Sequence, residues 1–257
     1  MAERLFVSQT SGPIVLGLSL PTGTVRVQVD DRLTTARIEL YTADTSGPAA
    51  DAVNRARSEQ NGQALAIEVP KLPDNVMTQS VRGGRIVQHG GVMNFGTMTG
   101  VTMVNGRVIS GGSSGMQTVS PIEVRVHLPA RSSLAVVGTS TDAEVFGAVD
   151  QLEFRSVSGD LVADIVHSLV ANSTSGDISA GRIADRISAR TVSGDLSVDL
   201  YEGRDADLNS TSGDIDVQAT GSATGTVRAN TTSGDVRVRG GRHLHVSAHS
   251  LSGRVRA

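Results

Sequence analysis

One short phrase recurs six times in the C-terminal half of the chain: Ser or Thr, any residue, Ser-Gly-Asp, and then an aliphatic residue. The glycines of successive copies are 17 to 21 residues apart, and Arg replaces Asp in the last copy. A degenerate seventh copy precedes them at residues 140–145. A regular period of about 20 residues indicates one supersecondary unit stacked on itself, because a single unit cannot bury its own apolar face.

Each copy alternates apolar and polar residues on both sides of its Ser-Gly-Asp corner. Leu169 and Ala171 precede one corner, and Ile178 and Ala180 follow it. This period-2 pattern indicates two short strands joined by a corner, whereas a helix would need apolar residues spaced by 3.6. About 20 residues per circuit suits a narrow parallel β-helix, in which each rung pairs with its neighbours ~4.8 Å away. We therefore predict an all-β protein whose residues 140–257 form a parallel β-helix (β-solenoid) of about seven rungs.

The corner residues are predicted to be structural. Glycine is favoured where φ is positive or where another backbone approaches closely, and Asp can accept hydrogen bonds from the amides of its own turn. A cation held by the stacked aspartates is the other interpretation, although the glycine-rich calcium-binding nonapeptide is absent from the sequence. The predicted structural corner consists of Gly159, Asp160, Gly176, Asp177, Gly194, Asp195, Gly213, Asp214, Gly234, Asp235 and Gly253.

These Ser/Thr-x-Ser-Gly-Asp-aliphatic rungs resemble the repeats of a bacterial "putative adhesin" family of unknown function that is common in actinobacteria. Residues 12–27, from Gly12-Pro13-Ile14 onward, are similar to the β-rich N-terminus of that family. The resemblance covers most of the chain except a central insertion. It implies a β-solenoid without an assigned enzymatic activity.

Motifs and composition do not point to an enzyme. The sequence has no His-Glu-x-x-His motif, phosphate-binding glycine loop, dinucleotide fingerprint or nucleophile elbow. It has no cysteine, which excludes disulfides and thiolate metal sites. His243, His245 and His249 are the candidate metal-ligand group, but without a companion carboxylate a solvated strand face is favoured. We predict no catalytic residue, no metal and no cofactor.

The chain divides into three predicted segments. Residues 1–75 form a β-rich head with one short helix that starts at Ser46-Gly47-Pro48, and this head is expected to cap the first rung. Residues 76–119 are an insertion, and residues 120–257 are the solenoid. The first eight residues lack the apolar run of a secretory signal, and no run of 18 apolar residues occurs. We therefore expect a cytoplasmic protein without a membrane span.

The insertion differs in composition from the rest of the chain. It holds ten of the 29 glycines, five of the six methionines and no acidic residue. Short β-prone pieces of low charge alternate with its glycines, a pattern typical of cross-β pairing. Residues 84–90 resemble the core of bacterial amyloid-signalling motifs. Two interpretations stay open, namely a hairpin-forming insertion and a segment that pairs with a partner or with itself.

Charge is unevenly distributed along the predicted solenoid. Residues 142–216 carry 15 acidic and five basic side chains, whereas residues 219–257 carry six arginines and one Asp. A rod with an acidic middle and a basic end could dock head to tail on copies of itself. The basic end lacks aromatic residues and any nucleic-acid motif, so we do not expect nucleic-acid binding.

We therefore predict a non-enzymatic structural or interaction protein, a self-associating rod or scaffold whose partner is itself or another protein. The alternative is a carbohydrate-binding or carbohydrate-processing β-helix, although sugar-binding grooves usually offer aromatic platforms and this chain is 2% aromatic. The candidate self-association residues are Val92, Met93, Phe95, Met103, Val192, Thr211, Thr232, Leu251, Arg254 and Arg256.

Overall fold

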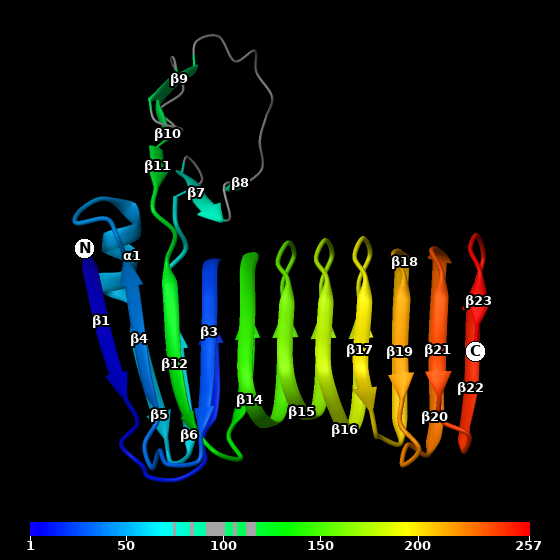
Figure 1. Ribbon diagram of the computed structural model, residues 1–257. Coiled ribbons are helices and arrows are strands. Elements are labelled where there is room, and N and C mark those ends of the chain that lie inside the picture. Colours follow the sequence, from blue (N-terminus) through cyan, green and yellow to red (C-terminus); the bar gives the residue numbers. More distant parts are fainter. Residues whose placement is uncertain (74–75, 83–84, 91–100, 105–106, 112–116) are drawn as a thin grey trace.

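The protein is a rod in which one β-sheet of 18 strands winds about a central axis (Figure 1). The structure is a computed structural model, and it describes residues 1–73, 76–82, 85–90, 101–104, 107–111 and 117–257. The solenoid makes about six turns. The predicted all-β parallel solenoid is therefore confirmed, with close to the predicted number of rungs.

The sheet has two long sides that face each other, which we name the A side and the B side. The long strands of the middle turns run round both. In order along the axis, the A side contains β1 (Ala2–Val7), β4 (Arg37–Thr42), β12 (Glu123–Pro129), β3 (Thr22–Asp30), β14 (Ser140–Arg155), β15 (Leu161–Asn172), β16 (Ile178–Arg190), β17 (Leu196–Tyr201), β19 (Ile215–Ala219), β21 (Val236–Gly240) and β23 (Val255–Arg256). The B side contains β5 (Arg57–Asn61), β6 (Ala64–Glu68), β2 (Val15–Ser19), β13 (Ser133–Val137), the second halves of β14, β15 and β16, and then β18 (Asp205–Ser212), β20 (Gly225–Ser233) and β22 (Leu244–Ser250).

Pairing is parallel throughout the repeats and antiparallel only near the N-terminal end of the described rod, between β1 and β4, β4 and β12, and β5 and β6. Equivalent residues of successive turns pair directly, so Leu161 lies beside Ile178, and Ile178 beside Leu196. All three side chains point inward and are at most 1% exposed. Burial of each such side chain contributes about 1.5–3 kcal/mol. The alternation seen in the sequence therefore builds a continuous aliphatic core between the two sides.

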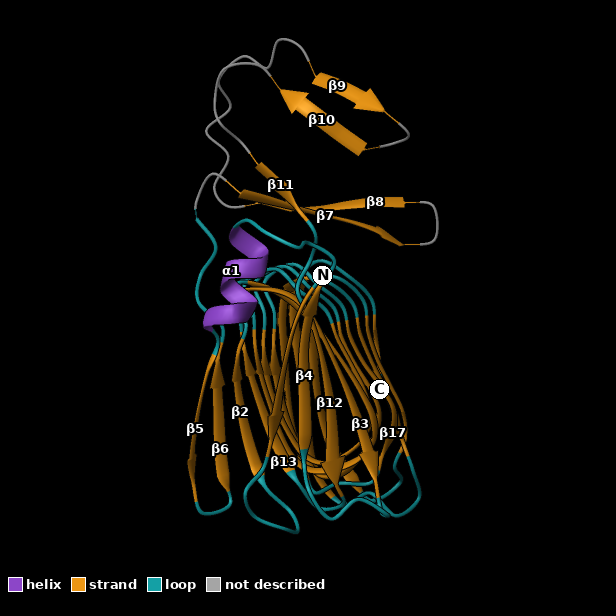
Figure 2. Ribbon diagram, turned by 90° about the vertical axis from the view of Figure 1, so that its left-hand side faces the viewer, coloured by secondary structure: helices purple, strands orange, loops and turns teal. Residues whose placement is uncertain are grey.

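The one helix of the described chain, α1 (Pro48–Arg55), lies at the N-terminal end of the rod beside β1 and β4 (Figures 1 and 2). It begins as predicted, with Gly47 at a positive φ and Pro48 in the first turn. Ala49, Ala52 and Val53 are buried against the core. The helix ends earlier than the sequence pattern indicated, because the chain turns extended at Ala56 and enters β5. No helix in the described part of the chain has the length and apolar character to cross a bilayer.

The head is built into the solenoid. Strand β3 pairs in parallel with β14, and β2 with β13, so the strands of the head continue both sides of the repeat region. Apolar and polar residues alternate in β3, β4 and β6, whereas β5 is polar throughout. Elements α1, β1, β4 and β5 lie at the N-terminal end of the rod (Figure 1), and the capping role expected of the head stays a prediction.

The strands described in the insertion lie beyond the ends of the rod strands (Figure 1). Strands β7 (Val76–Arg82), β8 (Arg85–Gly90) and β11 (Gln117–Val119) form one small sheet, and β9 (Val101–Val104) pairs with β10 (Arg107–Gly111). Met103 lies on β9 opposite Val108. The other candidate residues of the insertion, Val92, Met93 and Phe95, lie outside the described residues.

Candidate functional site

The corner glycines lie one above another along one edge of the rod. A Cβ built on Gly176 would be 2.1 Å from the carbonyl oxygen of Gly159, and one on Gly194 would be 2.1 Å from that of Gly176. Gly213 and Gly253 repeat this relation at 1.9 Å. Among the six, only Gly234 has a positive φ, at 156°. Close approach of the neighbouring turn therefore requires glycine at all six corners, and a positive φ is a second reason at Gly234 alone.

The corner aspartates form a hydrogen-bonded ladder that links each turn to the next. The Asp195 amide donates to Asp177 Oδ1 at 2.8 Å, and the Asp214 amide to Asp195 Oδ1 at 2.7 Å. The same bond joins Asp142 to Asp160, Asp160 to Asp177, Asp214 to Asp235, and Asp235 to the Arg254 amide. Our expectation that each Asp bonds the amides of its own turn was wrong. The neighbouring turn is only one strand spacing away, so its amide is the nearer donor.

This ladder predicts different effects for two substitutions of Asp177. Asp177→Ala should lower the free energy of unfolding by about 1 kcal/mol, because the Asp195 amide loses its acceptor. Asp177→Asn keeps Oδ1 and should lie within a few tenths of a kcal/mol of the wild type. Urea denaturation measures both, and equal losses would contradict the role assigned to Oδ1.

Buried hydroxyls satisfy the corner carbonyls from inside the rod. Thr231 Oγ1 donates to the Gly213 carbonyl at 3.0 Å, and Ser210 Oγ to the Gly194 carbonyl at 3.1 Å. Thr191 and Ser250 make the equivalent bond. These side chains are inward-facing and pair with backbone, which explains the Ser or Thr that opens every copy of the phrase. Because these hydroxyls donate to backbone carbonyls, their role in the corner is structural.

The residue that follows each buried hydroxyl points outward and forms an exposed ridge along the corner edge. Val192 is 47% exposed and Leu251 76%. The ridge contains Val157, Thr174, Val192, Thr211, Thr232 and Leu251. The predicted self-association residues of the repeat region thus include a straight file of β-branched and aliphatic side chains.

Most acidic side chains on the two flat sides have an arginine partner. Examples are Glu202 with Arg182 and Asp207 with Arg190, at 2.5 and 3.4 Å. Arg204 donates to Asp185 Oδ1, and this hydrogen bond lowers the pKa of Asp185 despite an opposing contribution from burial.

The corner aspartates differ from these paired residues, except that Asp235 pairs with Arg237. We name Asp142, Asp160, Asp177, Asp195 and Asp214 the acidic row. In the described part of the chain, none of these five residues has an ion-pair partner. Five carboxylates spaced by about 4.8 Å therefore present uncompensated negative charge along one edge.

The last turns are basic. We name Arg237, Arg239, Arg254 and Arg256 the basic end. Arg237 pairs with Asp235 at 3.3 Å, and Arg239 with Asp216 at 2.7 Å. The hydrogen bond from the Arg254 amide lowers the pKa of Asp235, and the positive charges of the nearby guanidinium groups lower it further by a smaller amount. Within the described residues, the side chains of Arg254 and Arg256 have no acidic partner.

The histidines of the last full turn do not converge. His245 and His249 lie on the outer face of β22, opposite Thr226 and Asn230, and His243 precedes the strand. Within the ranges that the structure describes, no three His, Asp or Glu residues are placed to hold a metal ion.

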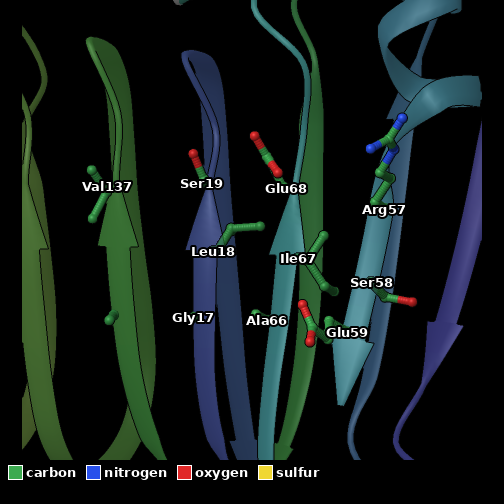
Figure 3. A pocket seen from close by; sticks show the side chains of 11 residues that line it. Gly17, Leu18, Ser19, Arg57, Ser58, Glu59, Ala66, Ile67, Glu68 and Val137 are labelled. Carbon is green, nitrogen blue, oxygen red and sulfur yellow. The ribbon is translucent and has the colours of Figure 1, made fainter.

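A depression of about 660 Å³ lies on the B side near the head (Figure 3). Its floor is made by three small residues that share one row, Ala66, Gly17 and Ala135. A Cβ on Gly17 would meet nothing within 4 Å, so the space above it is open. Arg57 and Glu59 from β5 stand at its side, and the lining contains no aromatic residue. The sequence analysis missed this depression, because its floor comes from three segments far apart in the chain.

With this architecture in view, the family of the protein can be assigned. The model of the Toastrack DUF4097 family matches residues 41–257, which include α1, the insertion and every turn of the repeat region. The chain belongs to this family. No curated protein sequence matches it.

Three solved structures are similar to this Toastrack DUF4097 chain at 12% identity. A putative adhesin from Bacteroides fragilis covers 99% of this chain and 97% of its own, with a TM-score of 0.49. A putative lipid binding protein and a putative adhesin, both from Parabacteroides distasonis, give TM-scores of 0.44 and 0.43; the alignments cover 100% and 99% of this chain and 97% of each of theirs.

Proposed function

We propose that this Toastrack protein is a non-enzymatic interaction protein, a rod that associates with copies of itself. The observation that carries the proposal is the unequal pairing of charges. Among the residues that the structure describes, the acidic row leaves five carboxylates without a cationic partner, while Arg254 and Arg256 at the basic end have no anionic one. Opposite charges left over on one rigid body are complementary between two such bodies.

The acidic row also has a defined form and an apolar neighbour. The acidic row is straight, because each carboxylate is held by a hydrogen bond to the next turn. The exposed ridge runs beside it and offers Val157 and Val192 as apolar contacts, 51% and 47% exposed. A single exposed ion pair contributes only about 0–1 kcal/mol, so association needs several charges together with this apolar ridge. Since the two surfaces differ, the contact is heterologous and can propagate into a filament.

Sedimentation velocity at several salt concentrations tests the proposal. At 20 mM NaCl and high protein concentration we expect oligomers or filaments, and at 500 mM NaCl we expect mainly monomers. The Debye length falls from about 20 Å to about 4 Å over this range, so the attraction between the acidic row and the basic end is screened. A monomer under all conditions, or assembly that does not respond to salt, would contradict the proposal.

A charge-neutral variant locates the contact. Asp160→Asn, Asp177→Asn and Asp195→Asn together keep every Oδ1 acceptor of the ladder and remove three negative charges. We expect this triple variant to stay folded and to be monomeric at low salt. The matched control is Asp30→Asn, Asp31→Asn and Glu59→Gln in the head, which changes the net charge equally and should assemble like the wild type. Glycan-array binding by a protein that never assembles would instead favour the carbohydrate-binding alternative.

A further inference from the structure

Three arginines alone line a pocket of about 300 Å³ on the outer face of the A side. Arg237 and Arg239 come from β21, and Arg256 comes from β23. We name this the arginine pocket. It lies at the opposite end of the rod from the depression in Figure 3, and its lining differs from that depression in having no apolar or neutral side chain.

The parallel register brings these arginines together. Arg237 pairs directly with Arg256, so their Cα atoms are one strand spacing, about 4.8 Å, apart. Arg239 lies two residues further along β21 on the same face, about 6.8 Å from Arg237. Three guanidinium groups on flexible stems can therefore converge on one small ligand.

The four turns before β21 carry no basic residue at the position of Arg237. This outward position is occupied, turn by turn, by Val162, Ser179, Ser197 and Asp216. Arginine recurs in the row near the head, where Arg26 pairs directly with Arg125, but Glu144 and Glu39 flank that pair on either side. Like charges directly opposite each other on neighbouring strands are destabilising. Placing Arg256 beside Arg237 thus costs stability unless negative charge is supplied.

The protein supplies only part of that charge. The acidic groups facing the arginine pocket are Asp235, which pairs with Arg237, and Asp216, which pairs with Arg239. Asp235 also accepts the Arg254 amide at 2.9 Å. Arg256 has no acidic partner in the described chain. Four arginines of the basic end against two aspartates leave a local charge of +2.

We propose that the arginine pocket binds a tetrahedral oxyanion, phosphate or sulfate, with Arg256 as its principal ligand and Arg237 and Arg239 completing the site. Guanidinium forks match the spacing of oxyanion oxygens and donate paired charge-assisted hydrogen bonds. The bound anion also relieves the repulsion between Arg237 and Arg256. This inference does not depend on self-association, although both use Arg256.

Arginine Nε–Hε NMR signals of ¹⁵N-labelled protein test the site directly. Sodium phosphate or sodium sulfate is titrated against sodium chloride at constant ionic strength, using the non-assembling triple Asp→Asn variant so that self-association does not contribute. We expect saturable shifts confined to the signals of the arginine pocket. Arg256→Gln should weaken binding by at least about tenfold, because the anion loses its charge-assisted hydrogen bonds to this guanidinium group.

The matched control is Arg32→Gln, which removes the same charge from an exposed arginine in the head and should leave the affinity unchanged. Equal weakening by both substitutions, or phosphate and sulfate shifts no larger than those of chloride, would overturn the proposal.

Two further binding experiments identify the source of the anion. Binding to phosphatidic acid vesicles, but not to phosphatidylcholine vesicles, would assign a phosphate headgroup, and binding of inorganic phosphate alone would assign the free ion.

Discussion

Replacing Gly194 by alanine should lower the free energy of unfolding by about 3 kcal/mol, the upper end of the range for overpacking. The new Cβ would lie 2.1 Å from the Gly176 carbonyl oxygen, 2.7 Å from its carbon and 3.0 Å from Thr191 Oγ1. Two of these three atoms are backbone, so no rotamer change relieves the clash. The neighbouring turn must move away, which stretches the corner hydrogen bonds on both sides. Gly194→Val should lose at least as much.

Urea denaturation and thermal melting measure this effect. For a chain of this size the loss corresponds to a decrease of roughly 6–12 °C in Tm. Gly221→Ala is the matched control, because a Cβ there meets nothing within 4 Å and φ is not positive. That variant should remain within about 1 kcal/mol of the wild type. If Gly194→Ala melts like Gly221→Ala, the turns are not packed as closely at the corner as described above.

Tyr201→Phe is expected to raise the free energy of unfolding by about 1–3 kcal/mol, whereas the glycine substitutions lower it. The Tyr201 side chain is fully buried in the core, and its hydroxyl has no hydrogen-bond partner among the described residues. A buried hydroxyl without a partner loses its hydration and gains nothing in exchange. The ring itself fills space, because the paired residue of the next turn is the small Ala219. Phenylalanine keeps that packing and removes only the unsatisfied group.

The two tyrosines of the chain permit a matched comparison. Tyr41→Phe removes a hydroxyl from a partly exposed site and should change the free energy of unfolding by less than about 0.5 kcal/mol. Destabilisation by Tyr201→Phe would show that the hydroxyl has a partner, such as a bound water, in solution.

Alkaline pH provides a second measure of the same site. Burial raises the pKa of Tyr201 above its ordinary value of 10.0. Below pH 10 the hydroxyl is neutral in both states and the pKa shift has no effect on stability. As pH rises above 10 the unfolded chain ionises first, so the folded state loses up to about 1.4 kcal/mol per pH unit. Denaturation at pH 8 and pH 11 should show this loss in the wild type and in Tyr41→Phe, and a smaller one in Tyr201→Phe.

The repeat phrase alone was sufficient to predict the parallel stack, because it fixes both the period and the alternation. Leu161, Ile178 and Leu196 occupy equivalent places in the phrase, and they pair in the structure. The head was harder to predict. Strand β5 consists of the polar sequence Arg57–Asn61 and becomes a strand because it pairs with β6, a tertiary contact that no local pattern reveals.

The candidate sites show the same contrast between features with a local sequence signal and features that depend on tertiary pairing. Arg256 was recognised from the sequence as a charged residue near the basic end, but its neighbours in the arginine pocket depend on the register between β21 and β23. The role of Asp177 was predicted for the wrong turn, since the sequence does not show which amide is nearest. The depression over Gly17 gave no local signal, because its small residues belong to three separate strands.

The direction of the hydrogen bonds between turns has a mechanical consequence. These bonds run along the rod, and the two ends of the described chain lie at opposite ends of its axis (Figure 1). A pulling force applied between those ends loads the turns in series, so they open one after another and not all at once. Each released turn of about 20 residues adds roughly 65–70 Å of extended chain. The rod would therefore lengthen in regular steps under tension and act as an extensible tether. A force directed across the axis would instead load the hydrogen bonds between neighbouring strands in shear and all at once, so the rod would resist it more strongly.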